Sequence, residues 1–187
     1  MRRKFGLSVP CSVRRFAVVG FVICLQAALA QPNRIIGSIN ADQWTVLPGH
    51  VHAKARAQYD RGEAPGDLQM QSVTLELRPS ESQQVAMDQL LREQQNPNSP
   101  SYHRWLTPEA YADRFGASKS DLAKIEDWAR SQGLTVTGTA RARNALSLSG
   151  SAAQIGTAFH TEIHLYKVNG ETHYANASDP AVPAAIR

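Results

Sequence analysis

The order of strand and helix patterns from residue 68 onward is the feature that most restricts the fold of this chain. Apolar residues alternate with polar ones at Val73, Leu75 and Leu77, which predicts a half-buried strand. Residues 81–95 then place apolar side chains at helical spacing. A strand followed by a helix therefore opens the ordered part of the chain.

The first predicted helix has clear start and stop signals. Ser80 is a good N-cap, and Gln83 is placed to complete a capping box. Pro97 ends the helix. The expected apolar face consists of Ala86, Met87, Leu90 and Leu91.

A second helix over residues 121–132 is expected to begin at Ser118 or Ser120 and to stop at Gly133, which suits a left-handed C-terminal residue. Two strands follow, over residues 134–140 and 145–150, with a turn over 141–144. The predicted inward-facing residues of these elements are Leu122, Ile125, Trp128, Ala129, Leu134, Val136, Leu146 and Leu148.

A third helix over residues 151–159 and a final hairpin complete the pattern. The hairpin is centred on Asn169 and Gly170, because both central positions of a type I′ turn need a positive φ. The order β-α-β-β-α-β predicts an α+β fold of the ferredoxin-like type, with one antiparallel sheet, extra helices after the first helix and a C-terminal hairpin. The expected apolar positions of the third helix are Ala152, Ile155, Ala158 and Phe159.

The chain begins with the pattern of an export signal. Residues 1–15 carry five basic residues and no acid, and residues 16–30 are apolar. Ala28 and Ala30 form a small-x-small cleavage site, so we expect residues 1–30 to be a signal peptide and Gln31 to be the first mature residue. About fifteen apolar residues are fewer than the roughly 20 that a spanning helix needs.

Removal of this segment changes the charge and the cysteine count. Twenty Lys and Arg residues minus five leave fifteen against sixteen acids, so the mature net charge is about −1 instead of +4. A nucleic-acid partner and a membrane attachment of the mature chain are therefore not expected. Both cysteines also leave, so burial alone must hold the mature domain together. We expect an irregular lead-in over residues 31–67, the domain over 68–179, and the start of an extended linker over 180–187, where Pro180 and Pro183 prevent a helix.

A proline-rich segment, residues 96–116, connects the first two predicted helices. Pro97 and Pro100 keep its start extended, and Thr107 with Pro108 predicts a short helix that closes at Gly116. Aromatic residues bury a large area with few torsions, so we expect an ordered segment that packs onto the domain. A core-closing crossover is favoured over a partner-binding role. The side chains expected to pack are Tyr102, Trp105, Leu106, Tyr111 and Phe115.

The same segment, NPNSPSYHRWLTPEAYADRFG, resembles the activation domain, or propeptide, of the sedolisin peptidases of family S53, the pro-kumamolisin type. The resemblance extends from about Leu47 to Ile186. The residues that carry the motif are Pro97, Ser99, Pro100, Tyr102, His103, Trp105, Leu106, Thr107, Pro108, Phe115 and Gly116.

The resemblance implies a domain that docks on a subtilisin-like peptidase domain, assists its folding, blocks its cleft and is released by autocleavage in acid. It implies a secreted or otherwise extracytoplasmic protein without a cofactor. The family's Ser-Glu-Asp triad, its oxyanion-hole Asp, its calcium site and its Ser-Gly-Thr-Ser motif cannot be placed in this chain. Ser149-Gly150-Ser151 lacks the required continuation, and Ser151 is expected to cap a helix. We therefore expect no catalytic residue and no enzyme activity in this chain.

Two histidine pairs are candidate metal ligands. His160 and His164 are assigned to a strand, where four residues span roughly 13 Å, and this distance excludes a shared metal. His50 and His52 lack a third ligand. No metal site is predicted.

Three functional hypotheses remain open from the sequence. The chain is an activation domain separated from its peptidase, a freestanding inhibitor or folding helper that acts in trans, or an unrelated ferredoxin-like binding module. In the first two cases the partner is a sedolisin-type catalytic domain. Sixteen carboxylates and six histidines make the mature chain compatible with release in acid, since many of them change charge between pH 7 and about 3.5.

Overall fold

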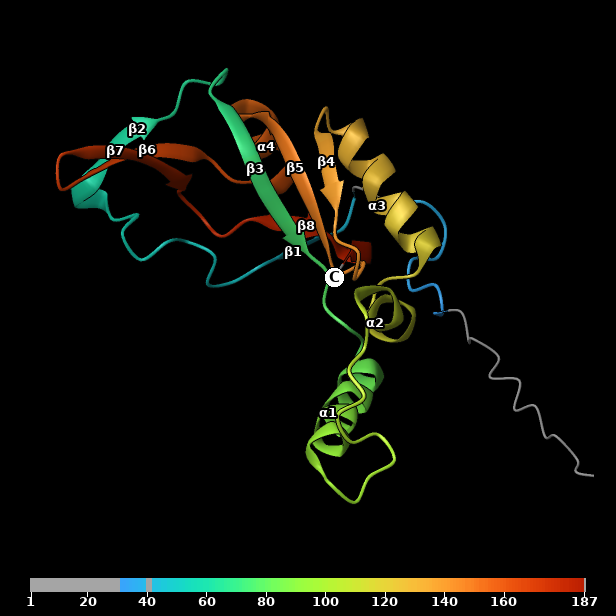
Figure 1. The fold of residues 1–187 in the computed structure, drawn as a ribbon. Coiled ribbons are helices and arrows are strands. Elements are labelled where there is room, and N and C mark those ends of the chain that lie inside the picture. Colours follow the sequence, from blue (N-terminus) through green and yellow to red (C-terminus); the bar gives the residue numbers. More distant parts are fainter. Residues whose placement is uncertain (1–30, 40–41, 187) are drawn as a thin grey trace, which may run out of the picture.

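The computed structural model describes residues 31–39 and 42–186 of the chain; the predicted signal peptide, residues 1–30, lies outside them. Helices and antiparallel sheets alternate along the described residues (Figure 1). The helices are α1 (Glu81–Gln95), α2 (Pro108–Phe115), α3 (Lys119–Ser131), α4 (Ala152–Phe159) and the 3₁₀ helices η1 (Ala57–Tyr59) and η2 (Ala184–Ile186). The strands are β1 (Trp44–Val46), β2 (Asp60–Glu63), β3 (Gln69–Glu76), β4 (Thr135–Thr139), β5 (Ala145–Ser151), β6 (Ile163–Val168), β7 (Glu171–Asn176) and β8 (Ala181–Pro183).

The central sheet has the strand order β3-β5-β4, with both neighbours antiparallel to β5. Leu146 of β5 lies opposite Leu75, and Leu148 lies opposite both Val73 and Val136. These apolar pairs share one face, because side chains alternate between the two faces of a sheet. The α+β class and the antiparallel central sheet are therefore confirmed.

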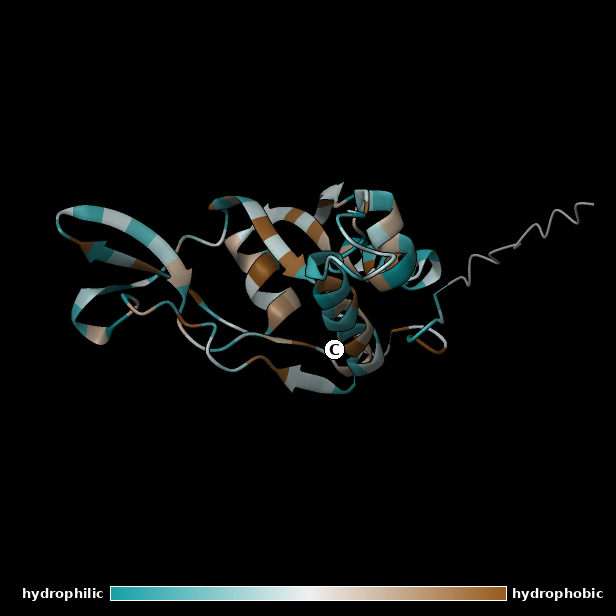
Figure 2. Cartoon of the chain, turned by 60° about the horizontal axis from the view of Figure 1, so that its bottom comes forward, coloured by the Kyte–Doolittle hydropathy of each residue, from teal (hydrophilic) through white to brown (hydrophobic). Residues whose placement is uncertain are grey.

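Helices α3 and α4 form the main core together with that apolar face. All four predicted positions of α3 and all four of α4 are buried, and Leu146 and Leu148 are fully inaccessible. Trp128 and Phe159 meet edge to face, with ring centroids 5.8 Å apart. Figure 2 shows hydrophobic residues gathered in the central strands and in α4. The predicted core residues of α3, α4 and β5 and Leu134 are therefore confirmed, whereas Val136 is half-buried.

Side-chain caps fix the start of each α-helix. Ser80 and Gln83 form the predicted capping box of α1, and Thr107 accepts a hydrogen bond from the N–H of Ala110 at the start of α2. Ser118, and not Ser120, caps α3. Gly133 follows α3 with a φ of +76°. These local signals placed the helix starts correctly.

The remaining strands differ from the single predicted sheet. β6 does not join β3; it lies between β2 and β7 in a second sheet, and β1 pairs with β8 in a third. The lead-in over residues 31–67 is thus not wholly irregular, because it supplies β1, η1 and β2. Both strands of the lead-in pair with segments far along the chain. Their own residues therefore show no sustained alternation of apolar and polar side chains by which they could be predicted.

The C-terminal stretch over residues 180–187 was predicted to be extended; it is extended through Pro183, but the 3₁₀ helix η2 follows directly, so the predicted absence of a helix is wrong there. It is not free, however: β8 pairs with β1, and all three of its residues are buried. The N–H of Leu47 donates to the carbonyl of Pro180 at 2.8 Å and continues this pairing. Where a linker begins remains a prediction.

Helix α1 projects away from the sheets and contacts the domain through α2 (Figure 1). Gln94 is its only fully buried residue. Of the predicted apolar face, Met87 and Leu90 are half-buried, whereas Ala86 and Leu91 are exposed. The predicted burial of this face is therefore only partly correct, because the two-turn helix α2 covers only part of the longer α1.

Candidate functional site

The first part of the proline-rich segment, residues 96–106, turns back along α1. The backbone N–H of His103 donates to the carbonyl of Gln94 at 3.0 Å. The buried side chain of Gln94 donates in turn to the carbonyl of Arg104. The segment and α1 therefore form one projecting arm, residues 81–106.

Three rings of this arm stack on one another. The centroid of His103 lies 3.8 Å from that of Tyr102 and 5.8 Å from that of Trp105. Tyr102 is 38 % exposed and Trp105 is 66 % exposed, so the prediction that both pack onto the domain is wrong. The reason is that the segment folds back on α1, where the rings stack on one another and no other element of the described residues covers them.

Helix α2 joins this arm to the sheets. Ala112 and Phe115 are buried, and the half-buried ring of Tyr111 lies 5.4 Å from Phe115. Gly116, which follows the last residue of α2, leaves no room for a side chain. A Cβ at this position would collide with the carbonyl oxygens of Ala142 and Ala112. Tight backbone approach explains the glycine in the motif.

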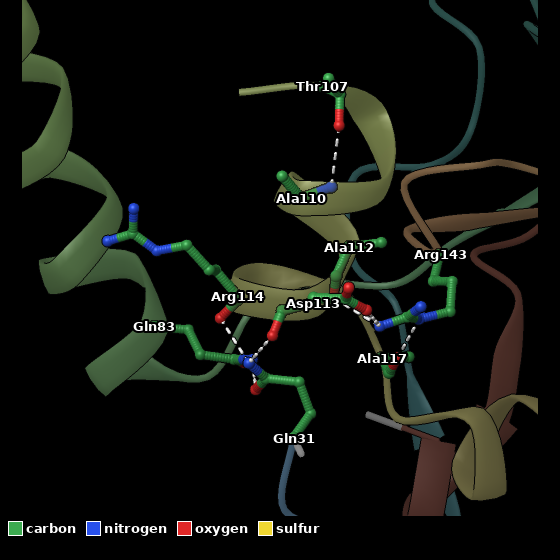
Figure 3. A network of polar contacts seen from close by, with 9 residues as sticks. All are labelled: Gln31, Gln83, Thr107, Ala110, Ala112, Asp113, Arg114, Ala117 and Arg143. Carbon is green, nitrogen blue, oxygen red and sulfur yellow. Dashed lines mark hydrogen bonds and ion pairs between the residues drawn. The ribbon is translucent and has the colours of Figure 1, made fainter. Parts of the chain in front are cut away.

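Arg143 holds the C-terminal end of α2 against the turn between β4 and β5 (Figure 3). Its guanidinium donates to the carbonyl of Ala117 at 2.9 Å and to that of Ala112 at 2.8 Å, and it pairs with Asp113 at 2.9 Å. The side chain is only 16 % exposed. Sequence reasoning assigned residues 141–144 to a turn and missed this role, since the partners lie about 30 positions away along the chain.

Gln31 connects α1 to α2 (Figure 3). Its side-chain amide donates to the carbonyls of Asp113 and Arg114, at 2.8 and 2.6 Å, and accepts from the amide of Gln83. The residue predicted to be the mature N-terminus therefore bridges α1 and α2. Cleavage before it remains a prediction.

The second face of the central sheet is a candidate docking surface. The register places Thr74 opposite Ser147 and Thr135 opposite Ser149, on the side away from Leu146 and Leu148. These side chains are small and are exposed or half-buried. We call this surface the bare face; it consists of Thr74, Glu76, Thr135, Gly138, Ala145, Ser147 and Ser149. Glu76, at the end of β3, is the only long side chain among these residues, so another protein surface can approach the middle of the sheet closely.

An ion pair connects β2 to β6. Nδ1 of His164 lies 2.9 and 3.0 Å from the two carboxylate oxygens of Asp60, and Nε2 lies 3.3 Å from Glu162. The hydrogen bond with Asp60 raises the pKa of His164 above 6.5, against the opposing effect of burial. The pKa of Asp60 is lowered from 3.8, first by the N–H of Gly62 and then by His164.

This pair predicts a pH dependence of stability. The contribution of His164 is fully present below about pH 6.5 and is lost as the pH rises through its raised folded-state pKa. The contribution of Asp60 is present above about pH 3.8 and is lost as the pH falls through its lowered folded-state pKa. We therefore expect His164→Gln to reduce the rise in melting temperature between pH 8 and pH 5, measured by circular dichroism.

His173→Gln is the matched control, because His173 is an exposed histidine of the neighbouring strand β7, 3.6 Å from Glu171. It is expected to keep the wild-type pH profile. An identical profile for His164→Gln and the wild type would show that the Asp60–His164 pair does not stabilise the fold.

The other sequence candidates have structural positions. Asn169 and Gly170 have φ values of +52° and +90°, so the predicted hairpin turn is confirmed. Ser151 and Gln154 form the capping box of α4, as expected for Ser151. His160 was predicted to lie in a strand, and this is wrong. It follows the last residue of α4 with a φ of +49° and stacks on Trp44. The backbone N–H of His50 donates to Asp179, and Nδ1 of His52 accepts from the N–H of Lys54.

Residues 31–39 and 42–186 contain no group of three or more His, Cys, Asp or Glu side chains placed to hold a metal ion. In the same part of the chain, no helix has the length and apolar character needed to span a membrane.

Comparison with known proteins gives a consistent result. Residues 57–187 match the family model described as pro-kumamolisin, activation domain. The chain is 31 % identical over 141 residues to kumamolisin from Bacillus sp. (strain MN-32), covering 75 % of this chain and 25 % of that protein. It is 23 % identical over 183 residues to sedolisin from Pseudomonas sp. (strain 101), covering 98 % of this chain and 29 % of that protein. A third match, xanthomonalisin from Xanthomonas sp. (strain T-22), is 29 % identical over 90 residues, covering 48 % of this chain and 11 % of that protein. The chain thus spans less than a third of each of these relatives.

Proposed function

Since the chain belongs to the pro-kumamolisin activation-domain family, the propeptides of sedolisin-type peptidases, we propose that it binds a sedolisin-type catalytic domain, assists its folding and inhibits it. The partner acts in cis or in trans. The chain itself performs no bond chemistry, and its role is recognition by shape.

The bare face of the central sheet is the observation that carries this proposal. One face of the sheet is filled by α3 and α4, while the other presents small hydroxyl-bearing side chains over three strands. A folded partner that covers this face would meet a rigid surface with few side chains to order. Low ordering cost supports binding, because immobilising side chains at an interface consumes part of the binding free energy.

Release in acid and export complete the proposal. The mature segment contains sixteen carboxylates and six histidines, and protonation changes the charge of both kinds of group. An interface that depends on carboxylate pairs weakens as those groups are protonated. Autocleavage after this domain would then free the peptidase. The charged and apolar pattern of residues 1–30 supports delivery outside the cytoplasm.

Assisted refolding tests the proposal. A sedolisin-type catalytic domain, such as that of kumamolisin, is unfolded in guanidinium chloride and diluted into buffer at about pH 6 with and without one equivalent of the purified chain. After a shift to about pH 3.5, we expect several times more peptidase activity in the sample that contained the chain. If the catalytic domains of kumamolisin, xanthomonalisin and sedolisin each gave the same yield of activity with the chain as without it, the folding role would be contradicted.

A further inference from the structure

The sheet β2-β6-β7 ends in an open edge. β7 pairs with β6 over its whole length and is the outer strand of this sheet. The two-residue turn makes Val168 and Glu171 a hydrogen-bonded pair, so the N–H and C=O groups of Thr172 and Tyr174 point away from β6. In the described part of the chain, neither residue makes a backbone hydrogen bond beyond its own strand. An extended peptide therefore finds unpaired backbone groups at this edge.

A pocket of about 270 Å³ lies beside the same edge. Its walls come from the loop before η1 and from β6 and β7. A strand added to β7 would direct alternate side chains to the face on which the pocket opens. The lining residues are His52, Lys54, Ala55, Tyr166, Val168, His173, Tyr174 and Ala175.

The polar groups of the pocket favour a carboxylate. Lys54 is exposed, and its ammonium has no ion pair within the described residues. The imidazole of His52 also lines the pocket, and because its Nδ1 accepts from the N–H of Lys54, its Nε2 can donate to an anion. Two acids lie near the pocket: Asp60 is paired with His164, and the exposed Glu171 lies 3.6 Å from His173.

Tyr166 offers a further donor to the pocket. Its side chain lines the pocket and is 4 % exposed, and its hydroxyl makes no hydrogen bond within residues 31–39 and 42–186. The hydroxyl is not itself a buried unpartnered atom, since among the described side chains only Nε1 of Trp128 is one. Burial raises the pKa of this tyrosine, so the group remains a neutral donor. A carboxylate in the pocket would accept its hydrogen bond.

We propose that the edge of β7 and this pocket bind an extended peptide segment, with the side chain of a glutamate or aspartate placed between Lys54 and Tyr166. The backbone of β7 supplies affinity for any extended peptide, and the pocket selects the acidic residue. The site is separate from the bare face, so the inference stands whether or not a peptidase domain docks there.

The test uses the purified chain labelled with nitrogen-15 and a capped peptide, acetyl-Thr-Val-Glu-Val-Thr-amide. Nuclear magnetic resonance titration is expected to shift the amide signals of Thr172 and Tyr174 and to give a dissociation constant below about 1 mM. A peptide with Gln in place of Glu is expected to bind about tenfold more weakly, as is the Lys54→Gln variant. Free glutamate, which has no backbone to pair, is expected to cause no shifts at these amides.

Two further variants make the result specific. Lys167→Gln removes a lysine of β6 that faces the other side of the sheet, and it is expected to leave binding unchanged. Tyr166→Phe is expected to weaken binding with an unchanged melting temperature, since the hydroxyl makes no hydrogen bond with any described residue. Equal affinity for the Glu and Gln peptides, shifts confined to other strands, or no shifts at about 2 mM peptide would each overturn the proposal.

Discussion

Replacing Leu146 with alanine is expected to lower the free energy of unfolding by about 3 to 4 kcal/mol. Leu146 is fully inaccessible in the central strand β5, opposite Leu75 and beneath the helices. Removing three carbon atoms there loses their transfer free energy and leaves a cavity, because β5 has a partner on each side and cannot move inward. Urea denaturation followed by circular dichroism measures the change.

Leu91→Ala is the matched control for this prediction. Leu91 lies on the projecting helix α1 and is 47 % exposed, so its truncation should change the free energy of unfolding by less than about 1 kcal/mol. If both variants lost the same stability, the core would not be centred on β5. The comparison therefore tests which layers hold the domain together.

Replacing Ser149 with arginine is expected to weaken binding to a sedolisin-type catalytic domain by about 100-fold or more. Ser149 lies at the middle of the bare face, opposite Thr135. A long cationic side chain there would separate the two surfaces and would be buried without a partner, at a cost of several kcal/mol. The fold itself should tolerate the change, because the side chain points away from the core. Inhibition constants measured against a peptide substrate report the loss.

Thr157→Arg provides the same added charge elsewhere. Thr157 is an exposed residue of α4, on the opposite side of the sheet from the bare face. It is expected to keep wild-type inhibition. Equal loss in both variants would indicate a general effect of charge, and unchanged inhibition by Ser149→Arg would place the docking surface elsewhere.

The sequence correctly predicted those features that depend on contacts between residues close together along the chain. The caps at Ser80, Thr107 and Ser151 and the turn at Asn169–Gly170 depend on neighbouring backbone groups, and the structure contains all of them. The faces of α3, α4 and β5 follow from periodicity alone. In each case, the side-chain pattern and the backbone conformation are set by the same few residues.

Long-range partners could not be predicted in the same way. β1 and β2 are short and pair with β8 and β6, which lie more than 100 residues further along the chain. Arg143 is one residue of an apparent turn until its contacts with α2 are seen. Trp105 has the large aromatic side chain typical of a core residue, but the segment that contains it folds back on α1 and leaves it exposed. In each case, the position of the residue or strand depends on a contact with a segment that is distant in the sequence or folds back on it.

The most direct test of the central claim is titration of the mature catalytic domains of kumamolisin, xanthomonalisin and sedolisin with the purified chain. Residual activity on a peptide substrate is measured at about pH 6 and at about pH 3.5. We predict stoichiometric inhibition of at least one peptidase at the higher pH, relief of inhibition at the lower pH, and no hydrolysis by the chain alone. Full activity of all three peptidases at both pH values, or hydrolysis by the chain itself, would contradict the account.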